Sequence, residues 1–376
     1  MGLNEPGENA VEALVNMIKH NAVLRTLVLD LSPRITPLHY KELSIAIRLY
    51  NGVLEEISLA ENALSVKAVE YIARIFDSKE VAVNKLILTN CSLKHPHMTS
   101  LMKYILSAQR LTYLDLSGNP IGDKGAAIII EMLSGKVNPL TSKAQPPLVK
   151  LDLSSCSMTS QGTADVLEAL SLRTTLTWLD LSHNIIGPDN LTAYSALAKC
   201  SIQDIRLNCC KICSKGASLI FKSLSDKTTQ FSKSVRYLYL SGNEISDSST
   251  EALCMLLERN LTLEAMDLGF NLFTDRNSEM LKQAASVHSN SQIERKILDL
   301  SVNLVGNKCD PYMLETPGMS RAKSNFLYGV QPNSADPANH GYSHIPHCSR
   351  GHFMARKELD NHYREFIPLN SLNSIM

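Results

Sequence analysis

Hydrophobic residues recur along the chain in a short phrase of alternating positions that ends on a polar turn residue. The phrase reads LxxLxLxxNxL, and its clearest copies begin at Leu54, Leu111, Leu176, Val235 and Leu263. Weaker copies begin at Leu24, Val83, Leu148, Ile202 and Arg295. Because the copies follow one another at intervals of about 28 residues, the sequence predicts an array of one repeated structural unit.

Each unit is predicted to contain a strand, a turn and a helix. Alternate leucines such as Leu114 and Leu116 point to one side of a short strand, while Tyr113 and Asp115 point to the other. The second half of a unit has apolar residues at helical spacing. The turn carries a side chain that can hydrogen-bond the turn backbone. It is expected at Asn119, Asn184, Asn243, Asn271 and Asn303, with Cys91, Cys156 and Cys210 in three other copies.

No unit can cover its apolar face alone, so the units are expected to stack. Stacking gives an α/β solenoid with a parallel β-sheet on the concave face and helices on the convex face. The unit of about 28 residues with Asn or Cys after the strand resembles the ribonuclease-inhibitor-like leucine-rich repeats, over roughly residues 10–305. The resemblance implies a horseshoe fold, a cytosolic or nuclear setting, and protein recognition in place of catalysis.

The repeat pattern divides the chain into three parts. Residues 1–20 are predicted to form a partial repeat that caps the array, residues 21–305 the leucine-rich repeat domain of about ten repeats, and residues 306–376 an irregular tail. Two insertions, residues 134–147 and 226–234, lie between a helix and the next strand, so both should project from one rim. We interpret them as tolerated surface loops, with recognition loops as the alternative.

The tail is rich in proline and has no periodicity, yet it carries many aromatic residues. Aromatic anchors in an extended chain are a common means of docking on a surface. We therefore expect the tail to be a docking segment. Its candidate partner-binding residues are Phe326, Tyr328, Tyr342, Phe353, Tyr363 and Phe366.

Composition narrows the classes of partner. The 376 residues include 37 Lys and Arg against 37 Asp and Glu, and 44% of them are hydrophobic. A chain without net charge has no global field to attract nucleic acid or anionic lipid, so neither is an expected partner. The N-terminus lacks a secretory signal, and the apolar runs are too short to cross a bilayer. Nine cysteines, expected to be buried and unpaired, fit a reducing compartment. We expect a soluble cytoplasmic protein.

Two groups of residues have the chemistry of metal ligands. In the first, Cys209, Cys210 and Cys213, the middle residue falls at the turn position and no second ligand pair follows at metal spacing, which favours structural cysteines. In the second, residues 340–352, four His and one Cys show no recognisable metal signature, which favours a polar docking segment. We therefore expect no metal ion and no cofactor.

The sequence contains no motif typical of catalysis. A nucleophile elbow, a P-loop, a zincin helix and a Gly-rich dinucleotide turn are all absent, so we expect neither an enzyme nor a small-molecule substrate. Activators of Ran GTPase share this repeat type, and Arg34 in the irregular first turn could act there as a charge-stabilising group. Their acidic tail has no counterpart here, since this tail carries Arg350, Arg356 and Lys357. A neutral chain also lacks the field with which an acidic horseshoe attracts a basic ribonuclease.

The predicted concave face is the best candidate for binding a protein. Its outward strand positions place aromatic side chains beside a column of Asp residues, which suits a partner segment with basic and apolar groups. Alternatively, the Asp column reflects only the consensus of the repeat. The candidate partner-binding residues are Tyr113, Asp115, Asp152, Trp178, Asp180, Arg206, Tyr237 and Tyr239.

The leading hypothesis is a non-enzymatic scaffold or adaptor that is held in a multi-subunit assembly through the concave face and the tail. Horseshoes of this kind resemble those of ciliary and flagellar assemblies, which implies a cytoskeletal or axonemal setting. The alternative is a reversible cytosolic regulator of a signalling or GTPase partner.

Overall fold

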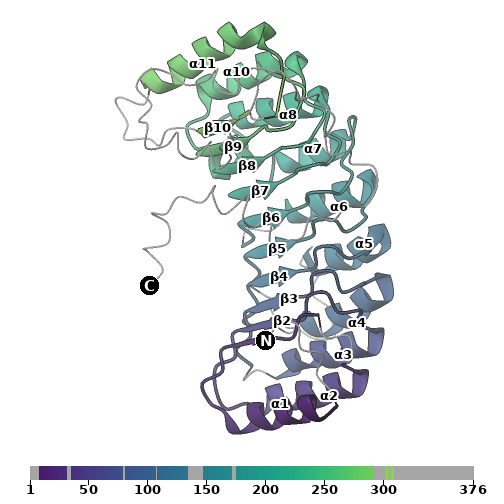
Figure 1. Ribbon diagram of the computed structural model, residues 1–376. Coiled ribbons are helices and arrows are strands. Elements are labelled where there is room, and N and C mark those ends of the chain that lie inside the picture. The colour runs from purple at the N-terminus through teal and green to yellow at the C-terminus, as the bar shows by residue number, and fades with distance from the viewer. Residues whose placement is uncertain are drawn as a thin grey trace, which may run out of the picture.

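The computed structural model describes residues 8–31, 35–78, 81–106, 108–133, 147–171, 175–291, 301–304 and 306–308. Within these ranges the chain forms a curved α/β solenoid with strands on the inner side and helices on the outer side (Figure 1). The fold predicted from the repeat is therefore confirmed. Of the predicted features, Arg34, nearly all of the first insertion and almost the whole tail, with its six aromatic residues, lie outside the described residues.

A single ten-stranded parallel sheet, in chain order, lines the concave side. Every strand is three residues long, and the first nine lie where the hydrophobic phrase predicts them. The strands are β1 (Thr26–Val28), β2 (Glu56–Ser58), β3 (Lys85–Ile87), β4 (Tyr113–Asp115), β5 (Lys150–Asp152), β6 (Trp178–Asp180), β7 (Asp204–Arg206), β8 (Tyr237–Tyr239), β9 (Ala265–Asp267) and β10 (Ser301–Asn303).

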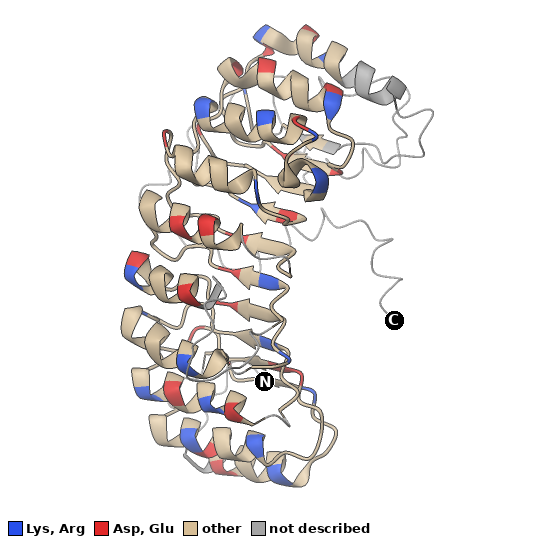
Figure 2. Ribbon diagram, turned by 180° about the vertical axis from the view of Figure 1, so that it is seen from behind, with Lys and Arg blue, Asp and Glu red and all other residues tan. Residues whose placement is uncertain are grey.

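One layer of helices covers the convex side, and the main helix of each repeat packs on the main helix of the next repeat. The α-helices are α1 (Glu8–His20), α2 (Pro37–Arg48), α3 (Val66–Ala73), α4 (His95–Ile105), α5 (Gly122–Leu133), α6 (Ser160–Leu170), α7 (Leu191–Leu197), α8 (Ser214–Ser225), α9 (Gln230–Ser234), α10 (Thr250–Arg259) and α11 (Ser278–Ser291). Short 3-10 helices are η1 (Arg74–Asp77), η2 (Asp247–Ser249) and η3 (Asp275–Asn277). Basic and acidic residues are interspersed over this helical layer (Figure 2).

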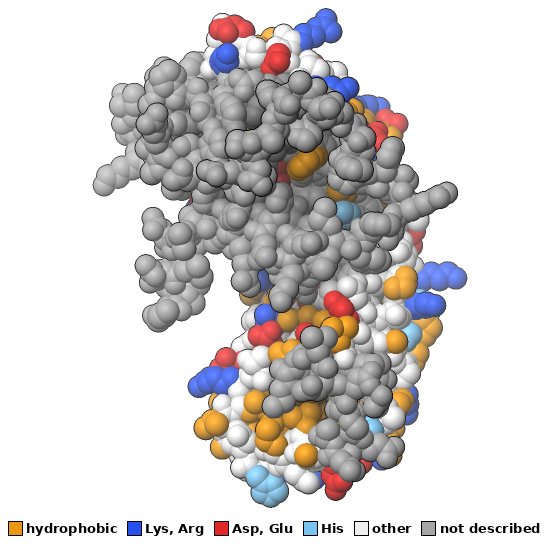
Figure 3. Space-filling view, viewed as in Figure 1, with side chains coloured by type: hydrophobic (Ala, Val, Ile, Leu, Met, Phe, Trp, Pro, Cys, Tyr) orange, Lys and Arg blue, Asp and Glu red, His pale blue; other side chains and the backbone are white. Residues whose placement is uncertain are grey.

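The core lies between the sheet and the helices and runs the length of the solenoid. Most leucines of the strand phrases are buried in it, and Leu114 and Leu116 are fully buried. From the other side, helical residues such as Ala164 and Leu167 of α6 pack against them, as their spacing predicts. At the N-terminal end, α1 packs against α2 and buries Ile18. Hydrophobic side chains gather at this end of the surface (Figure 3).

The buried turn residue joins each repeat to the one before it. Asn119 donates from Nδ2 to the carbonyl oxygens of Leu116 and, in the preceding repeat, Leu88, both at 2.8 Å. Its Oδ1 accepts the backbone N–H groups of Cys91 at 2.8 Å and Leu93 at 2.9 Å. Because these backbone groups are buried and unpaired by any strand, the side chain satisfies them and fixes the stacking.

The cysteines at the same turn position make fewer hydrogen bonds. Cys156 donates from Sγ to the carbonyl oxygen of Leu116 at 3.3 Å, and Cys210 donates to that of Leu181 at 3.4 Å. A thiol has no counterpart of the amide Oδ1, which the Asn turns use to bind the preceding repeat. Cys91, Cys156 and Cys210 are buried and form no disulfide, in agreement with the prediction, whereas Cys209 and Cys213 are only half-buried.

The last strand lies four residues further along the chain than the sequence predicts. The sequence predicted outward positions at Ile297 and Asp299 with Asn303 in the turn, and this prediction was wrong. In the structure Ser301 pairs with Ala265, and Asn303 itself lies in β10. Two overlapping frames both fit the phrase, and the structure adopts the second one. Asn307 takes the turn role: its Nδ2 donates to the Leu304 and Leu268 carbonyls, and its Oδ1 accepts the N–H of Phe273.

The second insertion is part of the packed fold instead of a projecting surface loop. Thr229 caps α9 by accepting the N–H of Ser232 at 3.0 Å. This short helix inserts Phe231 into the core, where the side chain is fully buried. The expectation of a loop that projects from the rim was therefore wrong for residues 226–234, because one aromatic side chain inside the segment has a place in the core.

Candidate functional site

The concave face presents two rows of side chains in register across neighbouring strands. In the first row Tyr113, Lys150 and Trp178 occupy equivalent positions on β4, β5 and β6. In the second row Asp115, Asp152 and Asp180 do the same, and Arg206 of β7 follows them. Strands in a sheet lie about 4.8 Å apart, so side chains in one row are close enough to interact.

Aromatic rings and cations form a connected series along this face, which we call the concave ladder: Lys85, Tyr113, Trp178, Arg206 and Tyr239. The Lys85 ammonium lies 5.5 Å from the centre of the Tyr113 ring, which meets the Trp178 ring edge-on at 6.2 Å and 73°. The Arg206 guanidinium lies 5.0 Å from the Trp178 ring and 4.9 Å from the Tyr239 ring. These distances allow cation–π attraction at the three steps that involve Lys85 or Arg206, and an edge-to-face contact between Tyr113 and Trp178. The structure therefore brings four of the predicted site residues into one continuous surface.

Arg206 also interacts with the acidic side chains around it. Its Nε lies 3.5 Å from Oδ1 of Asp204, and both side chains are about one-fifth exposed. Burial raises the pKa of Asp204 to about 6, although the neighbouring guanidinium opposes this rise. Burial alone would lower the pKa of Arg206, but the carboxylates of Asp204 and Asp180 raise it. Arg206 is therefore charged, and it offsets part of the negative charge of the concave face.

The predicted Asp column has a structural role in addition to its place on the surface. Asp115, Asp152 and Asp180 each accept the backbone N–H two residues later, at 3.0, 2.9 and 2.8 Å. Asp115 and Asp152 are buried and Asp180 is half-buried. The consensus interpretation of the column is thus correct in part, because these carboxylates hold the turns after the strands.

The same carboxylates repel one another. Burial first, and then the charges of Asp115 and Asp180, raise the pKa of Asp152 well above its ordinary value. Burial likewise raises the pKa of Asp180, while Arg206 lowers it. Three acidic groups in one row can attract a cation from a partner, because that cation would relieve their mutual repulsion.

Tyr237 extends the aromatic surface towards β9. Its hydroxyl donates to Oε2 of Glu264 at 2.5 Å, and Glu264 also pairs with Arg236. Burial, followed by the hydrogen bond to Glu264, raises the pKa of Tyr237 to about 12. The ring is therefore held in one orientation on the face.

Sequence reasoning placed several of these residues on the face but did not select them. Lys85, Asp204 and Glu264 were missed, and each is tied to a predicted residue by an interaction across or beside the strands. The available signal was the strand register, which puts Lys85 next to Tyr113. For the Asp turns the signal was the Ser or Gly two residues after each Asp, where a backbone N–H is exposed by the turn.

The predicted structural cysteines lie in and beside the turn after β7. Cys210 is buried at the turn position, and Cys213 donates from Sγ to the carbonyl of Pro188 at 3.6 Å. Among the described residues no three His, Cys, Asp or Glu side chains are grouped so that they could hold a metal ion. Nor is any helix in these ranges long and apolar enough to cross a membrane.

A second set of aromatic and cationic side chains lies on the convex face, and we call it the convex cluster: Lys67, Tyr71, Arg74, Lys103 and Tyr104. Lys67 and Arg74 lie 5.2 and 5.8 Å from the Tyr71 ring, and Arg74 and Lys103 lie 5.9 and 5.3 Å from the Tyr104 ring. The cluster therefore joins α3 to α4.

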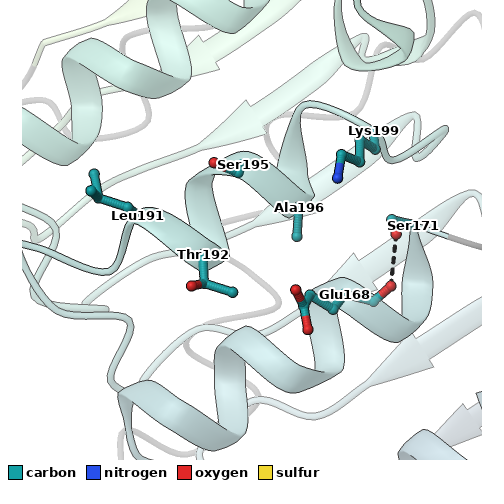
Figure 4. A pocket seen from close by; sticks show the side chains of 7 residues that line it. All are labelled: Glu168, Ser171, Leu191, Thr192, Ser195, Ala196 and Lys199. Atoms are coloured by element: carbon teal, nitrogen blue, oxygen red, sulfur yellow. Dashed lines mark hydrogen bonds between the residues drawn. The ribbon is translucent and has the colours of Figure 1, made fainter.

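A groove of about 490 Å³ opens on the convex face between α6 and α7 (Figure 4). Glu168 of α6 and Lys199, just after α7, point into it, and Leu191 and Thr192 line it at the start of α7. The helix on one side of the groove, α7, has seven residues and is shorter than α6 and α8.

Comparison with known proteins agrees with the repeat architecture. A family model described as "Leucine Rich repeat" matches residues 108–127 and 231–254. Bovine (Bos taurus) "NACHT, LRR and PYD domains-containing protein 5" is 28% identical over 251 residues, which are 66% of this chain and 22% of that protein. Pig (Sus scrofa) "Ribonuclease inhibitor" is 28% identical over 272 residues, which are 70% of this chain and 55% of that protein.

The chain thus spans about a fifth of the bovine relative and about half of the pig relative. Among solved structures, one described as "Crystal structure of TLR13-ssRNA13 complex" matches 78% of this chain and 37% of that one. Its TM-score is 0.40 at 17% sequence identity.

Proposed function

We propose that this chain, a leucine-rich repeat protein of the ribonuclease-inhibitor-like family, binds a protein partner on its concave face and acts as a non-enzymatic scaffold or adaptor. The observation that carries the proposal is the concave ladder. Its members come from five different repeats and contact one another in sequence, so they offer one extended surface with aromatic anchors. Buried aromatic and Arg side chains are the residues that contribute most energy to protein interfaces.

The charges on this face favour a partner segment with basic residues. The ten strands carry more acidic than basic side chains, although the whole chain is neutral. The acidic ones are Glu56, Asp115, Asp152, Asp180, Asp204 and Asp267, and the basic ones are Lys85, Lys150 and Arg206. Electrostatic complementarity of this kind fixes the register of a partner and accelerates its association. Apolar or aromatic groups beside the basic ones would pack on Tyr113, Trp178 and Tyr237.

Site-specific crosslinking tests the proposal directly. A photo-crosslinking amino acid at Lys150, which is exposed between Tyr113 and Trp178, should capture the partner in cells. The matched control is the same replacement at Lys222, which is exposed on α8 of the convex face. Capture of the same protein with equal yield at both positions, or at Lys222 alone, would contradict the proposal.

The finer prediction of a cytoskeletal or ciliary assembly rests on family analogy. Detergent extraction tests it, because a structural component stays in the insoluble cytoskeletal fraction whereas a freely diffusing protein is washed out. A version of the chain that ends at Asn307 shows whether the tail is needed for retention. Loss of the full-length chain into the wash would favour the regulator hypothesis.

Similarity to the pig ribonuclease inhibitor over 70% of this chain favours one form of that second hypothesis. A horseshoe with an acidic concave face could hold and inhibit a basic enzyme, even where the whole chain is neutral. Ribonuclease activity should then fall to zero at a one-to-one ratio of the two proteins. Unchanged ribonuclease activity at a tenfold molar excess of this chain over the enzyme would contradict the inhibitor hypothesis.

A further inference from the structure

We propose that the concave face binds a segment of its own chain, residues 319–357, and that an outside partner must displace this segment. The inference rests on the proposed binding face and adds its regulation. The segment follows the last described residue, Lys308, and contains two of the features that the concave face complements, which are basic charge and aromatic rings.

Charge complementarity is the first argument. Residues 319–357 carry five basic residues and one acidic residue, which gives the segment a net positive charge without counting its four His. The basic residues are Arg321, Lys323, Arg350, Arg356 and Lys357. On the concave face, Asp152 and Asp180 stand next to each other in one row, and their pKa values are raised by burial and by neighbouring charges. A cation from the segment would relieve this repulsion.

The arrangement of rings and charges within the segment is the second argument. Phe326 and Tyr328 follow Arg321 and Lys323 closely, and Phe353 lies between Arg350 and Arg356. The concave face offers the matching combination, because Tyr113 and Trp178 lie beside the acidic row. Rings of the segment can therefore pack on rings of the face while its cations approach the carboxylates.

The length of the connection permits this docking. Twelve residues lie between Lys308 and Arg321, and the thirteen residue steps that join them span about 43 Å when extended. Lys308 follows β10, and six strand spacings of about 4.8 Å separate β10 from β4. The acidic row on β4 to β6 is therefore within reach of the first basic cluster without any rearrangement of the repeats.

Trp178 is the single Trp of the chain and lies on this face, so its fluorescence reports directly on whether the face is covered. The experiment measures acrylamide quenching of Trp178 in the full chain. Three forms are compared: the natural sequence, a tail variant with Arg350→Glu, Arg356→Glu and Lys357→Glu, and a control variant with Lys103→Glu, Lys124→Glu and Lys222→Glu, which all lie on helices. The control reverses the same number of exposed charges within the described solenoid but away from the concave face.

The tail variant should increase the quenching constant about threefold, because it shifts the segment from bound to free, while the control should leave it unchanged. Raising the salt concentration from about 0.05 M to about 0.5 M should produce a similar increase in the natural chain. Equal quenching in all three forms would overturn the proposal. So would a quenching constant that depends on protein concentration, because the segment would then bind a neighbouring copy.

Crosslinking at Lys150 separates this inference from the proposed function. Crosslinks to peptides within residues 319–357 of the same chain support the docked segment. In the purified chain, where no partner competes, the absence of crosslinks to residues 319–357 overturns it but leaves the scaffold hypothesis intact. The crosslinker at Lys150 is also placed in the tail variant, whose concave face should be uncovered. If this variant captures no other protein in cells, the proposed function fails, while acrylamide quenching still shows whether the segment docks.

Discussion

The concave ladder and the convex cluster are built from the same residue types but differ in extent. The convex cluster joins two neighbouring helices, and Glu70 pairs there with Lys67 at 3.0 Å and Arg74 at 2.6 Å. The concave ladder crosses β3 to β8, and the Asp residues beside it occupy equivalent positions on neighbouring strands. Aromatic–cation contacts alone therefore do not identify a binding surface.

The difference arises from the geometry of the two faces. On the inner side, short strands lie in exact register about 4.8 Å apart, so one position of the repeat produces a continuous row. On the outer side, helices pack about 8–10 Å apart, so a cluster of contacting side chains extends over only two neighbouring helices. A partner segment can follow the inner row for several repeats, whereas the convex cluster is a contact between two elements of the fold.

The largest expected difference between the two regions concerns their arginines. Arg206→Ala should lower the free energy of unfolding by about 3 kcal/mol, because Asp204 and Asp180 would lose a buried counter-charge. Arg74→Ala should cost less than about 1 kcal/mol, because its side chain is 42% exposed. Urea unfolding of both variants gives the comparison. Equal losses would mean that Arg206 is not held by its acidic neighbours.

The next comparison concerns binding. Trp178→Ala should lower the affinity for the partner identified by crosslinking at Lys150 by about tenfold. An aromatic anchor at the centre of an interface contributes at least about 1.4 kcal/mol to binding. Tyr71→Ala in the convex cluster should leave the affinity unchanged. Titration of the purified partner measures both, and thermal melting verifies that both variants are folded. A similar loss for the two variants would place the interface elsewhere.

The smallest effects are changes of stability with pH, and they should have opposite signs in the two regions. Asp152 has a pKa raised in the folded state, so its charge destabilises the fold above that pKa. Asp152→Asn keeps an acceptor for the N–H of Ser154 and should stabilise the protein at pH 8 by roughly 0.5–1 kcal/mol. This gain should disappear as the pH falls, because the folded natural chain then takes up the proton.

Glu70 provides the matched control on the convex face. Hydrogen bonds first from Lys67 and then from Arg74 lower its pKa, so its charge stabilises the fold above the ordinary pKa of a Glu. Glu70→Gln should therefore destabilise the protein at pH 7 by a few tenths of a kcal/mol, and this loss should vanish in acid. Thermal melting between pH 4 and pH 8 follows both variants. Parallel pH profiles would contradict the electrostatic difference between the two faces.

Much of the fold could be predicted because the repeat phrase encodes one physical arrangement. Leu114 and Leu116 define a strand, and Asn119 then defines its turn, so the same phrase located nine strands. The position of the tenth strand was predicted wrongly because Leu298–Leu300 and Val302–Leu304 both fit the phrase. The burial of Phe231 was not predicted, because nothing in a non-repeating insertion indicates which side chain enters the core.

The candidate site could be predicted only as a set of positions. Periodicity placed Trp178, Arg206 and Tyr239 on one face, and the structure confirms that placement. It could not predict that the guanidinium lies between the two rings, because that depends on side-chain rotamers and on the burial of Asp204. Nor could it separate the turn role of Asp115 from a binding role, since one carboxylate serves the turn and faces the concave side.

The amide side chains of the turns also determine how the molecule would respond to a mechanical load. Asn119 holds the turn of the preceding repeat, and Asn184, Asn243 and Asn271 repeat that connection. Force applied to the C-terminal end would therefore break one connection at a time, and each released repeat would lengthen the chain by about 95 Å. A force–extension curve would therefore show a series of unfolding events at nearly equal spacing, one for each repeat that is released.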